Sequence, residues 1–134
     1  MKLNNNLLDV EYLKQQLGGT VLWTNPNPNT GFTPADINLP LNDGYDCYDV
    51  ITKIGSGVDS LEMLTNRLYK NKVAIACYPF YYNNLLYVRA RIYTHIQNST
   101  TNKITVGTGN NTGSDNNNVC IPYMIIGYKT GLFN

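Results

Sequence analysis

The chain has 134 residues, of which 43% are hydrophobic and 14% are charged, and its formal net charge is +1. This composition excludes an intrinsically disordered chain, which would be rich in charge and poor in apolar residues. It also argues against nucleic-acid binding through bulk electrostatics, because that requires a strongly basic field. Asn, Thr, Ser and Gly supply the polarity instead, and such neutral groups suit hydrogen-bonded contacts with a partner.

The N-terminal segment predicts one short helix over residues 7–17, which Gly18-Gly19 ends. Two heptads cannot hold a coiled coil alone, so the helix either packs on its own domain or forms the lower end of a symmetric bundle. We therefore expect residues 1–19 to serve attachment or oligomerisation and residues 20–134 to form the main domain. The candidate contacts are the apolar residues of the heptad pattern: Leu3, Leu7, Val10, Leu13 and Leu17.

The N-terminus does not resemble a secretory signal, because Asn and Asp interrupt its apolar residues. No window of the sequence approaches the length of apolar chain that a membrane span requires. We therefore expect neither export as a cleaved precursor nor membrane insertion.

Short β-strands are predicted from residue 20 onward, separated by turns rich in Gly, Pro and Asn. An antiparallel β-sandwich of jelly-roll-like form is the expected fold, with a small barrel as the alternative. Residues 60–69 are expected to form a short helix, with a strand as the alternative. The predicted strands are 20–24, 35–39, 46–54, 73–78, 85–96, 103–106 and 119–128.

Three of these segments carry more specific expectations. In the strand 46–54, Tyr48, Val50, Thr52 and Ile54 share one face, and Asp43-Gly44 predicts a hairpin turn before it. Residues 73–78 are apolar on both faces, which is typical of a central strand, and Pro79 is expected to end that strand.

The strand 85–96 alternates most cleanly of all. Its aliphatic residues, Leu86, Val88, Ala90, Ile92 and Ile96, are expected to face the core. The opposite face pairs Arg with Tyr, and such a face could contact another subunit, stack on sugar rings or bases, or simply be solvated. The residues of this candidate ligand or subunit-contact face are Tyr87, Arg89, Arg91, Tyr93 and His95.

No constellation of catalytic or metal-binding residues is predicted, and no cofactor is expected. Asp43, Asp46 and Asp49 lack the ligand pattern of a calcium loop, and in a strand the last two point to opposite faces. The glycine-rich segment 107–113 opens no helix, as a phosphate-binding loop would. The three cysteines, Cys47, Cys77 and Cys120, are expected to be buried reduced thiols.

Two stretches together resemble a small β module of tailed-bacteriophage virion proteins, found in tail fibres, baseplate components and head fibres. One stretch is Val-Leu-Trp-Thr-Asn-Pro-Asn-Pro at 21–28, followed by Phe-Thr-Pro-Ala-Asp-Ile-Asn-Leu at 32–39 and Tyr-Asp at 45–46. The other is Cys-Ile-Pro-Tyr-Met-Ile-Ile-Gly-Tyr-Lys at 120–129. Between these ends the chain matches only in strand rhythm.

The resemblance implies a non-enzymatic virion structural protein, commonly a homotrimer, that is assembled in the host bacterial cytoplasm. Its partners would be other virion proteins of the capsid or tail and a host-surface glycan. Without a long shaft before the module, a short head- or tail-fibre-like appendage or a capsid decoration subunit is expected. The alternative is a monomeric carbohydrate-binding module, which the content of Tyr and Asn favours, and an enzyme is a more distant third.

Overall fold

The computed structural model describes residues 18–41, 44–55 and 62–132, and within them the chain forms strands and no helix. The chain is therefore mainly β, as predicted. The predicted helix at 7–17 and its five heptad residues lie outside the described residues. The strands are β1 (Thr20–Thr24), β2 (Ala35–Asn38), β3 (Cys47–Lys53), β4 (Met63–Tyr69), β5 (Val73–Tyr82), β6 (Leu85–Gln97), β7 (Asn102–Val106), β8 (Asn110–Asn111), β9 (Ser114–Asp115) and β10 (Ile121–Tyr128).

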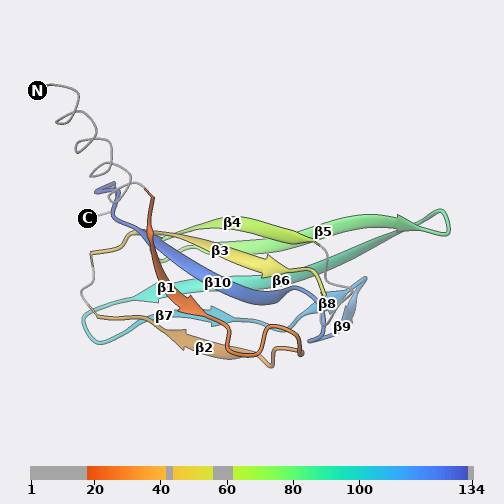
Figure 1. Cartoon of the computed structure of the whole chain (residues 1–134), viewed down its shortest axis with the longest axis horizontal. Helices are drawn as coiled ribbons and strands as arrows, with labels where there is room; N and C mark the ends of the chain where they lie inside the picture. Colours follow the sequence, from red (N-terminus) through yellow and green to blue (C-terminus); the bar gives the residue numbers. More distant parts are fainter. Residues whose placement is uncertain (1–17, 42–43, 56–61, 133–134) are drawn as a thin grey trace, which may run out of the picture.

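All strand pairs are antiparallel, and they form two sheets (Figure 1). The first sheet has the order β1-β10-β3-β4. In the second sheet β6 pairs along one edge with β5, and along the other with β7 and then β8. The strand β2 lies beyond β7, and β9 lies beyond β8.

Residues from both sheets form one hydrophobic core. The predicted face of β3 is confirmed, because Tyr48, Val50, Thr52 and the following Ile54 are all at most 4% exposed. Alternate residues of a strand point to the same side, so burial of every second residue identifies the core face. The core cluster comprises Ile37, Leu39, Tyr48, Val50, Leu68, Ala76, Tyr93, Ile104, Val106 and Ile125.

The strand β6 has the opposite orientation to the one predicted. Ile92 and Ile96 are 42% and 37% exposed, whereas Tyr93 and His95 are at most 1% exposed. The aliphatic residues therefore face outward, and the polar and aromatic residues face the core. The prediction failed because it assumed that the more hydrophobic face is the buried one, whereas buried polar groups are tolerated wherever they are hydrogen-bonded.

The strand β5 is also longer and more exposed than predicted. It continues through Pro79 to Tyr82, and its hydrogen-bonded strand partner is β6. Proline is compatible with a strand that has a free edge, because the missing N–H is not needed there. The turn that joins β5 to β6 is Asn83-Asn84, with φ of +51° and +61°. Asn accepts the left-handed conformation that two-residue hairpin turns require.

Two further predictions are wrong. Residues 63–69 form β4 rather than part of a helix, and Leu68 alone of that strand is fully buried. In addition, β2 and the following β3 are not a hairpin, because β2 pairs with β7 and β3 pairs with β4 and β10. The chain crosses between the sheets at this point, so a turn-forming dipeptide did not identify the pairing of the strands around it.

Candidate functional site

The predicted face of β6 divides into two parts with different environments. Arg91, Tyr93 and His95 are at most 1% exposed and belong to the interior. Tyr87 and Arg89 are only partly buried and lie nearer to the hairpin turn. The five residues therefore do not form one ligand-binding or subunit-contact face.

Arg91 has a structural environment. Nε donates to the carbonyl oxygen of Cys120 at 2.9 Å, and Nη1 donates to Phe32 and Gly107 at 3.0 and 2.8 Å. Nη2 donates to Asn117 and Val119 at 3.2 and 3.1 Å. A guanidinium has five N–H donors, so backbone carbonyls accept all of them. Burial lowers the pKa of Arg91, and the dipoles of five carbonyls compensate for the lost hydration of the cation.

Tyr93 and His95 also have internal partners. The hydroxyl groups of Tyr93 and Thr52 are 2.8 Å apart, which joins the two sheets. His95 Nδ1 accepts the backbone N–H of Asn71 at 2.9 Å, so Nε2 carries the proton that is shared with Asn102 Oδ1 at 2.8 Å. These contacts organise the core and the turn after β4.

Tyr87 and Arg89 belong to an aromatic cluster on the inner face of the β5–β6 hairpin. The Phe80 ring stacks on Tyr87, with centroids 5.5 Å apart and an interplanar angle of 19°, and on Tyr78 at 5.9 Å and 28°. The Arg89 guanidinium carbon lies 4.9 Å from the centroid of the Phe80 ring, which is within cation–π distance. Tyr82 meets Tyr87 edge-on at 6.2 Å and 65°. We call these five residues the hairpin cluster.

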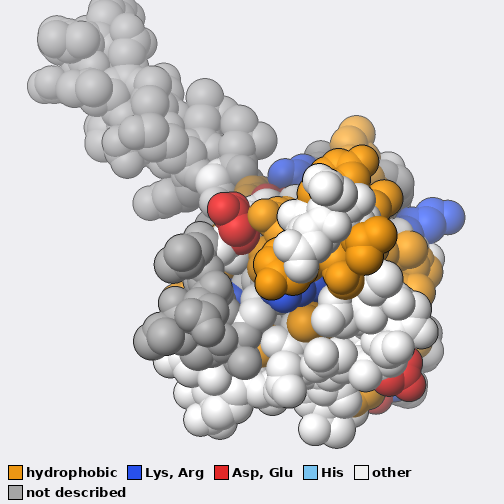
Figure 2. Space-filling model, turned by 90° about the vertical axis from the view of Figure 1, so that its right-hand side faces the viewer, with side chains coloured by type: hydrophobic (Ala, Val, Ile, Leu, Met, Phe, Trp, Pro, Cys, Tyr) orange, Lys and Arg blue, Asp and Glu red, His pale blue; other side chains and the backbone are white. Residues whose placement is uncertain are grey.

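The hairpin cluster borders a pocket of about 340 Å³, lined by Phe80, Tyr82, Tyr87, Arg89 and, from β8, Asn111. The hairpin extends beyond the rest of the molecule (Figure 1). Viewed from that end, hydrophobic side chains gather around it, with basic side chains beside them (Figure 2). The sequence-based prediction omitted Phe80 and Tyr82, because Pro79 was expected to end the strand. It omitted Asn111 because no strand was predicted between residues 106 and 119. The dipeptide Asn83-Asn84, a turn signal, would have identified the hairpin.

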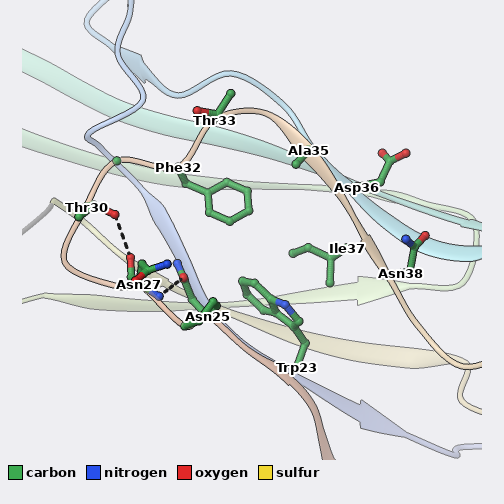
Figure 3. A pocket seen from close by; sticks show the side chains of 12 residues that line it. Trp23, Asn25, Asn27, Thr30, Phe32, Thr33, Ala35, Asp36, Ile37 and Asn38 are labelled. Atoms are coloured by element: carbon green, nitrogen blue, oxygen red, sulfur yellow. Dashed lines mark hydrogen bonds between the residues drawn. The ribbon is translucent and has the colours of Figure 1, made fainter.

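A second pocket, of about 470 Å³, lies between the end of β1 and β2 (Figure 3). Trp23 and Phe32 form its aromatic part, with their rings edge-to-face at 6.2 Å. Several of its polar groups are already occupied. Asn25 accepts the N–H of Asn27, and the Asp36 carboxylate accepts hydrogen bonds from Lys103 and Thr105, which lower its pKa.

The two stretches that carry the phage resemblance are adjacent in space. The strand β10 pairs with β1, and Trp23 lies opposite Ile125. Beyond the strand, the backbone N–H of Asn25 donates to Tyr123, and its side-chain amide donates to Pro122 at 2.8 Å. Residues of the first stretch thus line the second pocket, and the second stretch holds these residues in place through its hydrogen bonds to Asn25.

Two of the acidic residues singled out in the sequence, Asp46 and Asp49, have different hydrogen-bond partners. Asp46 accepts two hydrogen bonds from Thr130, both at 2.9 Å. Asp49 pairs with Arg67 at 2.6 Å and accepts the Tyr128 hydroxyl at 2.8 Å. Asp43 lies outside the described residues. Within residues 18–41, 44–55 and 62–132, no group of three or more His, Cys, Asp or Glu side chains could hold a metal ion.

The cysteines are free thiols in two kinds of environment. Cys47 and Cys120 are buried, as predicted, whereas Cys77 is exposed on β5, which corrects the third prediction. Cys77 is exposed because it lies on the outward face of β5, in register with Ala90 of β6.

No helix in the part of the chain that the structure describes is long and apolar enough to cross a membrane. No family model, curated protein or solved structure matches the chain.

Proposed function

We propose that the chain is a structural protein of a tailed-bacteriophage virion, a trimeric head- or tail-fibre-like appendage or decoration subunit with a part in host adhesion, and not an enzyme. Its partners would be capsid or tail proteins, and its place the virion. We also propose that the two sheets form a jelly-roll-like sandwich, for which their shared core is the support. The resemblance of residues 21–46 and 120–129 supports the virion assignment, and one surface supports the oligomer.

That surface is the outward face of β5 and β6, which we call the outer apolar face. Ten of its eleven residues are apolar, and none is charged. Ile75 and Leu86 are 56% and 54% exposed, and Ile92, opposite Ile75, is 42% exposed. The face comprises Val73, Ile75, Cys77, Pro79, Tyr81, Leu86, Val88, Ala90, Ile92, Thr94 and Ile96.

A face of this kind favours contact with another copy of the chain. Soluble monomers rarely expose continuous apolar patches of more than a few hundred Å², and larger ones mark interfaces. Without a charge, the face offers no electrostatic attraction to an anionic or cationic partner. When identical chains are related by a closed rotational symmetry, their apolar faces can pack together around the axis. A threefold axis is one such arrangement.

Sedimentation velocity at micromolar concentration tests the trimer. We expect three times the chain mass of 15.0 kDa. The double substitution Ile75→Asp and Ile92→Asp should give monomers, because it would place unpaired carboxylates in the interface. The matched control is Val21→Asp, which changes a residue that is 54% exposed on β1 of the other sheet, and it should remain trimeric. A wild-type protein that sediments as a monomer would refute the oligomeric proposal.

The N-terminal heptad pattern is tested separately by Val10→Asp with Leu13→Asp. Loss of the trimer in this variant, with the outer apolar face intact, would assign the assembly to residues 1–19. The virion assignment itself is tested by the neighbouring reading frames, which we expect to encode capsid or tail proteins.

A monomeric carbohydrate-binding module is the second candidate, and the hairpin cluster favours it. A monomer that binds a sugar specifically would select this function over the first.

A further inference from the structure

The hairpin cluster and the pocket beside it combine aromatic surface with polar groups that the protein itself does not use. Arg89 Nε and Asn111 Oδ1 are both shielded from solvent and have no hydrogen-bond partner. The two residues are directly opposite each other in the pairing of β6 with β8. Two other buried atoms in the described residues lack partners, on Asn66 and Gln97, but neither residue lines this pocket.

Unpaired buried polar atoms are costly, so a pair of them at one pocket calls for an explanation. One is a donor and the other an acceptor. Both side chains line the pocket, so a group bound there lies beside them. A hydroxyl group can accept from Arg89 and donate to Asn111, whereas a carboxylate or phosphate can only accept. A hydroxyl group therefore satisfies both atoms at once, whereas a carboxylate would leave Asn111 Oδ1 unpaired.

The remaining walls are aromatic. Tyr82 is 62% exposed and stands at 65° to Tyr87, and Phe80 and Tyr87 complete the aromatic lining of the pocket. Aromatic rings bury apolar groups and keep a hydroxyl at the rim for hydrogen bonding. The volume of about 340 Å³ is within the range of small-molecule sites. A molecule with C–H faces and several hydroxyl groups matches these walls, and a pyranose ring has both.

The second pocket, which Trp23 and Phe32 line, differs because several of its polar groups are already hydrogen-bonded. There Asn25, Asn27 and Thr30 hydrogen-bond within their own loop or to β10. These polar groups already hold the loop in place, so the hairpin pocket is the stronger candidate for a binding site.

We propose that the pocket formed by Phe80, Tyr82, Tyr87, Arg89 and Asn111 binds a neutral saccharide, one pyranose ring at a time. This proposal names a ligand class for the host adhesion in the proposed function. It rests on that adhesive role alone, because sugar binding requires neither a trimer nor a virion. Tyr81 is on the opposite face of the hairpin and does not take part. The site faces away from the outer apolar face, so sugar binding and self-association can occur together.

Saturation-transfer NMR on the full chain tests the site, with methyl glycosides of glucose, galactose, rhamnose and N-acetylglucosamine as the probes. We expect transfer to at least one of them, with an affinity that falls at least tenfold in Tyr82→Ala and in Arg89→Gln. The matched control is Tyr81→Ala, because Tyr81 neighbours Tyr82 and is 77% exposed on the other face. Binding by Tyr81→Ala should equal that of the wild type.

Absence of binding to all four probes would overturn the proposal, as would an equal loss in Tyr81→Ala and Tyr82→Ala. Preferential binding of a single-stranded oligonucleotide that Tyr82→Ala abolishes would also overturn it, because bases stack on aromatic side chains as well. Circular dichroism shows whether each variant folds, and Phe80→Leu provides a second aromatic substitution. Sedimentation of the same samples separates the two proposals. A trimer that binds no glycoside refutes the site and leaves the oligomer standing. A monomer that binds one refutes the trimer, leaves the site standing and favours the carbohydrate-binding module.

Discussion

Arg91 Nε donates a hydrogen bond of 2.9 Å to the carbonyl oxygen of Cys120, 29 residues away, and Cys120 itself has a φ of +52°. A non-glycine residue in this conformation is strained, and it persists only where its surroundings determine it. Its N–H donates to Ile54 at 2.8 Å, so both backbone groups of Cys120 are fixed. Arg91 thus connects the strand β6 to the chain segment that leads into β10.

Removing this guanidinium should destabilise the protein strongly. Arg91→Ala removes five hydrogen bonds to buried or partly buried backbone carbonyls. We expect a loss of more than about 3 kcal/mol in the free energy of unfolding. Arg91→Lys should recover only a small part, because an ammonium cannot reproduce the planar fork. Urea unfolding measures both, with Arg89→Lys as the control, which should change stability by less than about 1 kcal/mol. Equal losses at positions 89 and 91 would contradict the structural role of Arg91.

The three thiols should differ in reactivity toward iodoacetamide. The thiolate is the reactive form, and burial raises the pKa of Cys120 to about 11 and raises that of Cys47 as well. Cys77 is exposed. At pH 8 we expect one label per native chain, on Cys77, and three after denaturation in urea. Peptide mass spectrometry locates the label, and the variant Cys77→Ser should take up none while folded. If the outer apolar face is an interface, labelling of Cys77 should slow as the trimer forms.

Stability should decrease in alkaline solution. Burial raises the pKa of Cys120 from its usual 9.0 to about 11 and raises that of Tyr93, so the folded state holds both protons more tightly than the unfolded chain. The contribution of Cys120 is therefore fully present below about pH 9 and is lost as the pH rises through 11. Tyr93 acts in the same direction above pH 10, its usual value.

Thermal unfolding from pH 8 to pH 11 measures this effect. The decline of Tm should be shallower in Cys120→Ala, which no longer carries the titrating group. In the control Cys77→Ala the decline should match that of the wild type. Identical slopes in all three proteins would rule out a contribution from Cys120.

The hairpin turn should tolerate glycine and resist alanine. Asn83 and Asn84 both have positive φ, which costs an ordinary L-residue roughly 1–2 kcal/mol. Asn84→Gly should preserve or increase the protection of hairpin amides from hydrogen exchange, and Asn84→Ala should decrease it about tenfold. The matched position is Asn98, which lies in another turn and has no positive φ, so Asn98→Ala should leave the hairpin amides unchanged. Equal protection in both variants at position 84 would show that the turn does not control the hairpin.

Local pattern was enough to predict the β class and most strand positions. Alternation identified the buried face of β3, because Tyr48 lies opposite Leu68 of β4 and Val50 lies opposite Ile125 of β10, and all four side chains are fully buried. The exposed position of Cys77 and the continuation of β5 through Pro79 did not follow from local pattern. A free strand edge accommodates proline, and whether a strand has a free edge depends on how the other strands are arranged.

The orientation of β6, and with it the candidate site, was decided only by the tertiary structure. Arg91 can be buried because Phe32, Gly107 and three residues before β10 bring their carbonyls to it, and none of these lies within ten residues of it. Its burial turns Ile92 outward and Arg89 toward Asn111 of another strand. The alternation of β6 determined which residues share a face, but the distant carbonyls determined which face is inside. A periodic sequence defines two faces, and only the groups contributed by the rest of the fold make the burial of one of them favourable.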